Sequence, residues 1–407
     1  MGTAATGRED QMTAHRESSH KSFRLEGGFI WFVAQDWWYH NQAHSDFQLM
    51  KEVSRLAPVL VVNSLGMRLP GQATSTNPRR RIWRKIRSMT KLLRRPLKEL
   101  PNFHVYTPLM LPIYGSNGLL ARLNAALIRI QVRIVARLAG LNRDAAIGVT
   151  IPTAWPVVAP MRRSALVFNR SDLHSAFPEA DGAWVEGLER MLLQHSDHVL
   201  YVSHELMLRD EDLVGERAFF IDHGVDLEHF QREGSVHPEL AGIPNPRIGF
   251  FGGLDDYVVD MALLEETARS LPEASLVLVG DATCSMAALT ELPNVHWFGF
   301  RNYDEIPAFG RGFDVALMPW LDNEWIQHAN PIKLKEYLSL GLPVVTTNYP
   351  EVEPYRDHLR VARREDFAAE VAAAYEDPGD AEERVRFVRQ YSWTGRAEAL
   401  LHLIGNN

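Results

Sequence analysis

Short apolar runs alternate with longer amphipathic segments along this chain, and the alternation occurs twice. In the first half the apolar runs predict strands over residues 28–34, 59–62, 146–151, 166–169, 199–202 and 219–221, with a helix over 45–56. A stretch rich in glycine, proline and charge, residues 231–246, then interrupts the pattern. The second half predicts strands over residues 247–251, 275–279, 295–298, 315–318 and 342–346, with a helix over 261–270. Strands that alternate with helices indicate parallel sheets of the α/β class.

Two such runs joined by one linker predict two Rossmann-like domains that face a cleft. We expect a disordered polar tail over residues 1–24, an N-terminal domain over 25–235 and a C-terminal domain over 245–385. Residues 386–407 end in an amphipathic helix that no strand follows, so we expect this helix to cross back onto the first domain. The carboxyl ends of the strands are where such sheets bind ligands.

Composition narrows the class of protein. The chain has 407 residues and a hydrophobic content of 46%, which are typical of a globular protein. Its net charge of −8 argues against general nucleic-acid binding. Its single cysteine, Cys284, excludes an intramolecular disulfide framework and fits a reducing compartment. No signal peptide or membrane-spanning helix is evident. We therefore expect a cytoplasmic protein, peripheral at most on the inner face of the plasma membrane.

The segment 330–346 carries the clearest chemistry. Asn330 and Pro331 suit the start of a helix, and Gly341 suits the left-handed position after its end. Lys333 and Glu336 are three residues apart and share a helix face. A helix N-terminus beside a lysine can hold a diphosphate, and a carboxylate one turn later can accept hydrogen bonds from a ribose. Taken alone, the segment could also be an ordinary amphipathic helix with solvated charges.

Polar or glycine residues follow three other strands of the second half. Gly252 and Gly253 end one strand, Asp281 follows the next, and Arg301 follows a third, where it could flank a nucleobase. A glycine pair lets a backbone approach a phosphate, although a tight turn explains it equally well. Because all of these positions lie after strands of one domain, together they favour a nucleotide-binding site.

The order GFFGG, LVLVGD, NVHWFGF, FDVALMPW and NPIKLKEYLSLGLPVV resembles the donor domain of GT-B glycosyltransferases, most of all the family-4-like group, in an NPxK variant. Residues 169–172, 202–203 and 223–226 are similar to the xanthan-type glucuronosyltransferase. The resemblance implies a nucleoside-diphosphate sugar, expected to be a UDP-sugar, in the C-terminal domain and a glycan acceptor in the N-terminal one. It implies no metal and no cofactor beyond the nucleotide sugar.

The resemblance also bears on the catalytic residues. Many retaining members carry a second glutamate where this chain has His328, so the anomeric outcome stays open. The similar glucuronosyltransferase uses as its base the aspartate that matches Asp172, and a base near the acceptor hydroxyl would activate it. Asp172 could instead cap or turn its loop. Weaker candidates for the base or for shaping the acceptor site are Asp36, His40, His174 and His223.

A basic segment, residues 79–98, stands out in this acidic chain. It holds ten Lys or Arg and no Asp or Glu, with apolar residues at helical spacing. That pattern predicts an amphipathic helix on an anionic membrane surface, with Arg79, Trp83, Arg84, Lys85 and Arg87 in contact, although a solvated basic loop is the alternative. Residues 119–141, which include four arginines, are expected to form an ordinary helix that faces the core.

We therefore expect a glycosyltransferase that moves a sugar to a lipid-linked glycan in bacterial polysaccharide synthesis. The alternatives are a nucleotide-sugar epimerase of the same fold, such as a UDP-N-acetylglucosamine 2-epimerase, and a non-catalytic subunit. A transferase consumes donor only with an acceptor, an epimerase needs no acceptor, and a subunit binds without turnover. The basic segment and the aromatic pair Trp37 and Trp38 disfavour the epimerase, and Lys333 and Glu336 disfavour the subunit.

Overall fold

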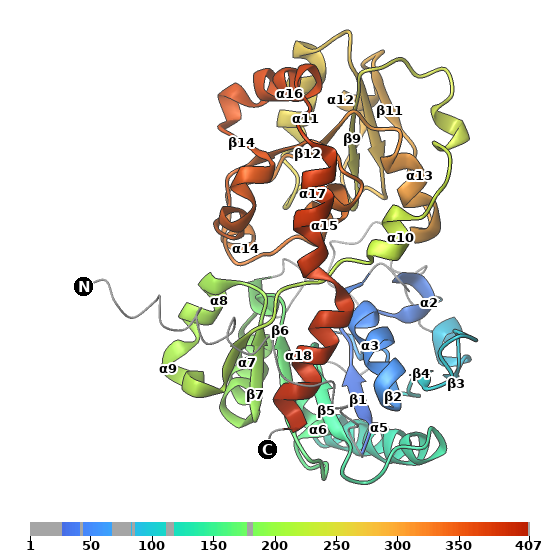
Figure 1. Cartoon of the computed structure of the whole chain (residues 1–407). Coiled ribbons are helices and arrows are strands. Elements are labelled where there is room, and N and C mark those ends of the chain that lie inside the picture. The colour runs from blue at the N-terminus through green and yellow to red at the C-terminus, as the bar shows by residue number, and fades with distance from the viewer. Residues whose placement is uncertain are drawn as a thin grey trace.

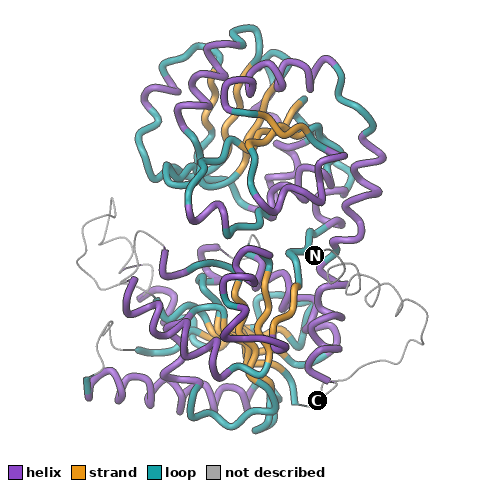
Figure 2. The backbone as a smooth tube through the Cα atoms, turned by 90° about the vertical axis from the view of Figure 1, so that its left-hand side faces the viewer, coloured by secondary structure: helices purple, strands orange, loops and turns teal. Residues whose placement is uncertain are grey.

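The computed structural model describes residues 27–40, 44–66, 83, 86–110, 118–176 and 182–405. The chain forms two lobes, one above the other in Figures 1 and 2, and each lobe is built on one sheet. The predicted tail over residues 1–24 lies outside the described part.

The N-terminal sheet has eight strands in the order β3-β4-β2-β1-β5-β6-β7-β8. All neighbours are parallel except β3 and β4. The strands are β1 (Phe29–Phe32), β2 (Val59–Val62), β3 (Leu93–Arg94), β4 (Phe103–Tyr106), β5 (Ala146–Val149), β6 (Leu166–Arg170), β7 (His198–Tyr201) and β8 (Ala218–Phe220). The helices of this lobe are α2 (Trp37–His40), α3 (Ser45–Leu56), α5 (Leu119–Leu138), α6 (Trp155–Val158), α7 (Gly182–His195), α8 (His204–Arg209) and α9 (Glu211–Val214).

The second sheet has six parallel strands in the order β11-β10-β9-β12-β13-β14. They are β9 (Arg247–Phe251), β10 (Ser275–Val279), β11 (Val295–Trp297), β12 (Val315–Met318), β13 (Val344–Thr347) and β14 (Arg360–Ala362). The helices that follow α10 (Leu227–Gln231) are α11 (Met261–Ser270), α12 (Ala287–Thr290), α13 (Ile306–Gly310), α14 (Glu324–Gln327), α15 (Ile332–Ser339), α16 (Phe367–Glu376), α17 (Ala381–Val388) and α18 (Trp393–Gly405).

Each sheet is covered by two hydrophobic cores, one on each face, because successive residues of a strand point to opposite sides of the sheet. In the N-terminal sheet Ile30 and Phe32 pack toward α5, α6 and α7, while Phe29 and Trp31 pack toward α3 and α18. Helix α18 thus joins the core of the first domain, as predicted for the last segment of the chain, and Figure 1 shows it descending from the upper lobe to the lower.

Buried polar contacts hold the two domains together. The side chain of Lys335, in α15, is fully buried and its Nζ lies 2.8 Å from Asp222 Oδ1. Asn330 donates to the carbonyl oxygen of Val202 at 2.8 Å and to Asp222 Oδ1 at 2.9 Å. Glu351 of the upper domain accepts from the backbone N–H of His204. The carboxyl end of β7, which Val202 follows, therefore faces the C-terminal domain.

Two sequence expectations are wrong. Pro331, not Asn330, is the N-cap of α15, because the Asn330 amide bonds instead to the other domain. The basic segment is not one helix through Lys98: among its described residues the helix ends at Met89, and Leu93–Arg94 form β3, which is antiparallel to β4.

Candidate functional site

The predicted donor side of the candidate site lies where β9, β10 and α15 meet. Gly252, at the end of β9, has φ +142° and Gly280, at the end of β10, has φ +153°. A Cβ atom on Gly280 would lie 1.7 Å from the carbonyl oxygen of Gly252, and one on Gly252 would lie 1.8 Å from Lys333 Cε. The positive φ angles and these close neighbours require glycine at both positions. The short distance from Gly252 to Lys333 shows that the Lys333 side chain lies directly across the end of β9.

Lys333 and Glu336 interact electrostatically, as their spacing predicts. Burial lowers the pKa of Lys333, and the negative charges of Glu336 and Asp255 oppose that change. Burial raises the pKa of Glu336 to about 7, against a partial counter-effect of the Lys333 charge, and Asp226 raises it further. Glu336 is 9% exposed. At neutral pH its carboxyl group can therefore exchange a proton without a large change in free energy.

The N-terminus of α15 lies beside Lys333. Its first N–H groups have no partner within the helix, and they carry the positive end of the helix dipole. Tyr337, one turn further, accepts a hydrogen bond from the N–H of Phe251 at 3.0 Å and so fixes the end of β9 against α15. Backbone donors, a lysine and a close-packed glycine turn thus converge at one edge of the second sheet, an arrangement that suits a diphosphate.

The other predicted donor residues have different surroundings. Gly253 follows Gly252, and a Cβ atom there would lie 2.8 Å from Asp255 Oδ2. Asp281 is exposed, and its carbonyl oxygen accepts from the N–H of Leu254 at 2.9 Å. Arg301 is paired with Glu239 at 2.6 Å and its guanidinium lies over the Phe298 and Phe309 rings. Arg301 therefore already has an anionic partner on the protein.

On the acceptor side, Asp172 follows the carboxyl end of β6. Burial raises its pKa to about 6, while the charge of His174 and a hydrogen bond from Ser171 act in the opposite direction. Arg170 pairs with Tyr201 in the register of β6 and β7, and Val202, which follows Tyr201, contacts Asn330. Asp172 therefore stands at the edge of the sheet that faces the C-terminal domain.

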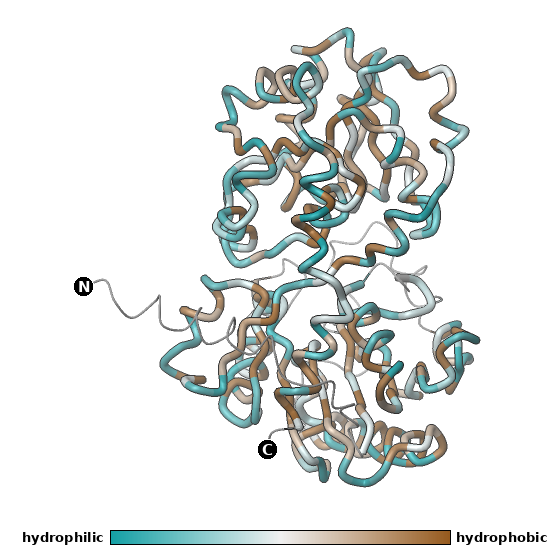
Figure 3. Tube along the Cα trace, in the orientation of Figure 1, coloured by the Kyte–Doolittle hydropathy of each residue, from teal (hydrophilic) through white to brown (hydrophobic). Residues whose placement is uncertain are grey.

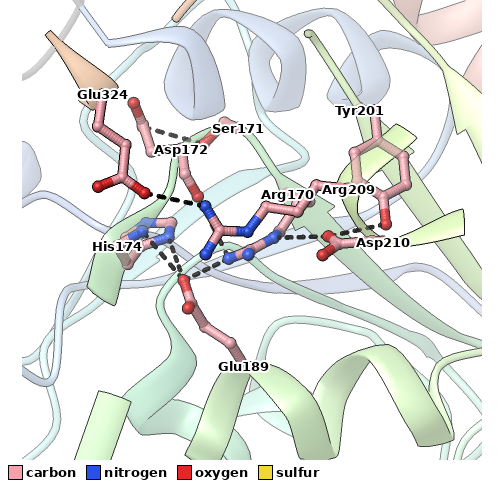
Figure 4. A network of polar contacts seen from close by, with 9 residues as sticks. All are labelled: Arg170, Ser171, Asp172, His174, Glu189, Tyr201, Arg209, Asp210 and Glu324. Carbon is pink, nitrogen blue, oxygen red and sulfur yellow. Dashed lines mark hydrogen bonds and ion pairs between the residues drawn. The ribbon is translucent and has the colours of Figure 1, made fainter. Parts of the chain in front are cut away.

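A buried network supports the loop that carries Asp172 (Figure 4). Arg170 is 2% exposed, and its guanidinium contacts Glu189 of α7 and lies 3.1 Å from Asp210 Oδ2. Glu189 also accepts from the N–H of His174 at 3.0 Å, and Arg170 donates to the carbonyl oxygen of Asp172 at 3.4 Å. These contacts fix the loop on both sides of Asp172. The partners of Arg170 are distant in sequence, so no local pattern indicates this supporting role.

A second buried carboxylate, Asp46, was also missed. It is fully buried at the start of α3 and accepts hydrogen bonds from Trp31 at 3.0 Å, Thr150 at 2.7 Å and Asn169 at 3.1 Å. These partners come from the carboxyl ends of β1, β5 and β6, so Asp46 ties three strand ends together beneath the acceptor side. Its negative charge also raises the pKa of Asp172.

The weaker candidates are placed as loop and interface residues. Asp36 accepts from Ser88 at 2.6 Å and from the N–H of Trp38 at 3.0 Å, which shapes the loop after β1. His223 is buried between the domains near Trp393, and burial lowers its pKa to about 3. His328 follows α14 and contacts the carbonyl oxygen of Glu324 at 2.7 Å. The backbone of His40 ends α2.

An apolar cavity of about 730 Å³ opens beside these acceptor-side loops. Its walls come from segments that follow β2, β4 and β5 and from the start of α7, and α5 closes one side. The lining includes Leu65, Met110, Ile128, Trp155, Trp184 and Met191. It therefore belongs to the same sheet edge as Asp172. Among the described residues no cluster of His, Cys, Asp or Glu is arranged to hold a metal ion.

Comparison with known structures decides the fold. Anabaena Alr3699/HepE, solved with UDP and glucose, superposes with a TM-score of 0.65 at 15% identity over 94% of this chain and 100% of that one. Sucrose-phosphate synthase from Thermosynechococcus elongatus superposes with a TM-score of 0.66 at 12% identity over 92% of this chain and 97% of the other. The chain has the GT-B fold.

Sequence comparison shows similarity to glycosyltransferases for part of the chain. Residues 245–377 match the family described as Glycosyl transferases group 1. A protein of Bacillus subtilis (strain 168), provisionally named a teichuronic acid biosynthesis glycosyltransferase, TuaH, is 30% identical over 196 residues, which are 46% of this chain and 48% of that protein. The match thus spans about half the length of this curated relative. The family match covers the C-terminal domain.

Proposed function

We propose that this GT-B protein is a glycosyltransferase that moves a sugar from a nucleoside-diphosphate sugar, expected to be a UDP-sugar, to a glycan. The observation that carries the proposal is Lys333 lying across Gly252 at the start of α15. The match of residues 245–377 to a glycosyltransferase family and the UDP found in the HepE structures support it.

The donor diphosphate lies at the N-terminus of α15. There the Lys333 ammonium and the helix N–H groups stabilise the negative charge that develops when the diphosphate leaves, so no metal ion is required. Glu336, one turn further, accepts from the ribose hydroxyls, and Gly252 and Gly253 leave room for the phosphates. Asn330 contributes indirectly, because its amide fixes α15 to Val202.

Asp172 is the proposed base. As the bond between the anomeric carbon and the diphosphate oxygen breaks, an acceptor hydroxyl oxygen bonds to that carbon and its proton passes to Asp172. A pKa of about 6 leaves the carboxylate ionised at neutral pH and still a competent proton acceptor. The Arg170 network keeps the loop in place during this transfer.

The acceptor is proposed to be a lipid-linked glycan of a bacterial polysaccharide, used at the inner face of the membrane. The apolar cavity supports this, because it is lined by segments that follow strands of the same sheet, and a purely hydrophilic acceptor has no need of its apolar lining. The name of the TuaH relative points to the same class of product. Membrane contact through the basic segment remains a prediction for Trp83 and Arg87, which are exposed, while Arg79, Arg84 and Lys85 lie outside the described residues.

The test measures nucleotide release from UDP-, GDP- and dTDP-sugars, with and without a bacterial lipid extract that contains lipid-linked saccharides. A transferase releases nucleoside diphosphate only with the extract, and Lys333→Ala loses that release while Arg389→Ala, at an exposed position of the upper domain, keeps it. Conversion of the sugar nucleotide without extract would identify an epimerase. Binding of nucleotide with neither reaction in any extract would identify a non-catalytic subunit.

A further inference from the structure

Helix α5 has two apolar faces, although a helix at a protein surface normally has one. Its inner face, with Asn124, Ala125, Ile128, Val132 and Ala136, is buried against the N-terminal core. Seven further leucines and isoleucines lie on the outside, with 44% to 73% of each side chain exposed: Leu119, Leu120, Leu123, Leu127, Ile130, Ile134 and Leu138. The expectation of an ordinary core-facing helix is therefore correct for only one side of α5.

The seven exposed residues form one stripe. At 3.6 residues per turn, Leu123, Leu127, Ile130, Ile134 and Leu138 recur on the same side through the whole helix. Figure 3 shows hydrophobic positions along α5 at the lower right of the molecule, and Figure 1 places this helix at the lower boundary of the N-terminal domain. An apolar stripe of this length marks an interaction surface.

The charge on α5 indicates what the stripe contacts. The helix carries four arginines, Arg122, Arg129, Arg133 and Arg137, and no aspartate or glutamate. At 100° per residue, Arg122, Arg129 and Arg133 lie on the flank between the outer stripe and one edge of the buried face, and Arg137 lies at the edge of the stripe itself. An apolar stripe edged by cations on a helix without anions suits the boundary between anionic headgroups and acyl chains.

The remainder of the basic segment lies next to this helix. Leu93 of β3 is opposite Tyr106 of β4, and the Tyr106 hydroxyl donates to Gln131, in the middle of α5, at 2.8 Å. Leu92, beside β3, is 44% exposed. The cations Lys91, Arg94, Arg95 and Lys98 belong to this neighbouring segment.

We propose that the outer face of α5, with its seven exposed leucines and isoleucines and its four arginines, is the main surface by which this protein binds an anionic membrane. The basic segment adds charge beside it. A second copy of the chain fits this face poorly: in a two-fold dimer through α5 the arginines of one protomer would approach those of the other without an acidic residue on either helix.

Membrane contact at α5 also places the apolar cavity next to the membrane surface. Ala121, Ala125 and Ile128 line the cavity from the inner side of the helix whose outer side would lie in the membrane surface. The apolar part of an acceptor could then pass from the bilayer to the cavity along the start of α5. This last step rests on the proposed lipid-linked acceptor, whereas the binding of α5 to lipid does not depend on any transfer activity.

The test is sedimentation of the full-length chain with phosphatidylcholine vesicles that contain or lack phosphatidylglycerol. The charge variant Arg129→Gln with Arg137→Gln should bind anionic vesicles about 25-fold more weakly, since each basic group near such a surface contributes about a factor of five. The stripe variant Leu123→Gln, Ile130→Gln and Ile134→Gln should weaken binding at least about tenfold. Gln keeps the helix propensity, and none of these side chains is buried.

Matched controls sit elsewhere on the surface. Leu208→Gln replaces a leucine of α8 that is 62% exposed, and Arg386→Gln with Arg389→Gln removes two exposed charges from the upper domain. Both controls should bind vesicles like the unmodified protein. UDP binding by every variant shows that the fold and the donor site are intact, so failure of the membrane surface is distinguishable from failure of the proposed function.

A label gives an independent readout. An environment-sensitive fluorophore on Leu127→Cys, in a Cys284→Ser background, should shift to shorter wavelength with anionic vesicles and not with neutral ones. Equal binding by the stripe variant and the unmodified protein, or no fluorescence shift, would overturn the proposal. So would a lipid-free dimer, seen by sedimentation velocity, that the stripe variant abolishes, because the face would then be a contact between copies of the chain.

Discussion

Glu336 links the candidate site to the pH dependence of stability, because its carboxyl group is buried and its pKa is raised. Burial raises its pKa from an ordinary 4.5 to about 7 even though Lys333 stabilises the ionised form. The folded state therefore holds this proton more tightly than the unfolded chain. It follows that the free energy of unfolding decreases as pH rises between about 4.5 and 7.

The size of the effect follows from that difference. At ~1.4 kcal/mol for each pKa unit, ionised Glu336 costs the folded protein about 3 kcal/mol above pH 7. Glu336→Gln keeps the shape and removes the charge, so it should raise the free energy of unfolding by up to about 3 kcal/mol at pH 8.5. This value is already net of the Lys333 interaction, because that interaction is one of the causes that set the pKa of Glu336. At pH 4 both proteins are neutral at this position and should be equally stable.

Thermal unfolding followed by circular dichroism at several pH values measures this difference. Glu376→Gln, at an exposed position that ends α16, is the matched control and should leave the midpoint unchanged at every pH. The same Glu336→Gln variant should bind donor more weakly, because a neutral amide oxygen accepts from the ribose hydroxyls less strongly than a carboxylate does. Equal midpoints for Glu336→Gln and the unmodified protein at pH 8.5, or a gap that persists at pH 4, would refute the reasoning.

Three further substitutions test other parts of the site. Lys333→Ala should reduce turnover about a hundredfold or more, because the leaving diphosphate loses an electrostatic partner, and steady-state nucleotide release measures this. Asp172→Asn should abolish transfer but leave donor binding intact. In the unmodified enzyme kcat/KM should rise with pH through about 6 as Asp172 ionises, so activity that is flat across that range would argue against this base. Asp222→Ala should lower the free energy of unfolding by about 3–5 kcal/mol, since it leaves Lys335 buried without its carboxylate, whereas Lys335→Met with Asp222→Ala should recover most of that loss in urea unfolding.

Much of the fold was predictable from local pattern. The strands Val59–Val62, Arg247–Phe251 and Ser275–Val279 and the helices Ser45–Leu56 and Met261–Ser270 have the predicted bounds. Each is a continuous apolar run or a clear helical period with polar residues at its ends. The strand Phe103–Tyr106 was missed, because FHVY is short and includes a histidine, and it is strand pairing with β2 that completes it.

The residues of the proposed donor side were also visible in the sequence, since they lie within one short segment and in the turns after two strands. The contacts that hold the site together were not. Asp46 bonds to residues as far away as Asn169, and Lys335 pairs with Asp222, more than one hundred positions earlier. No local pattern specifies such partners. The outer stripe of α5 was misjudged for a related reason, because periodicity shows two apolar faces but not which one the rest of the chain leaves exposed.

The most direct test of the central claim is calorimetric titration of the unmodified protein and of Lys333→Ala with UDP, GDP and dTDP. We predict saturable binding of one nucleotide, expected to be UDP, at a single site, and a large loss of affinity in Lys333→Ala with unchanged thermal stability. Nucleotide binding that is unaffected by Lys333→Ala, or no binding of any nucleotide by the folded protein, would contradict a donor site at the start of α15.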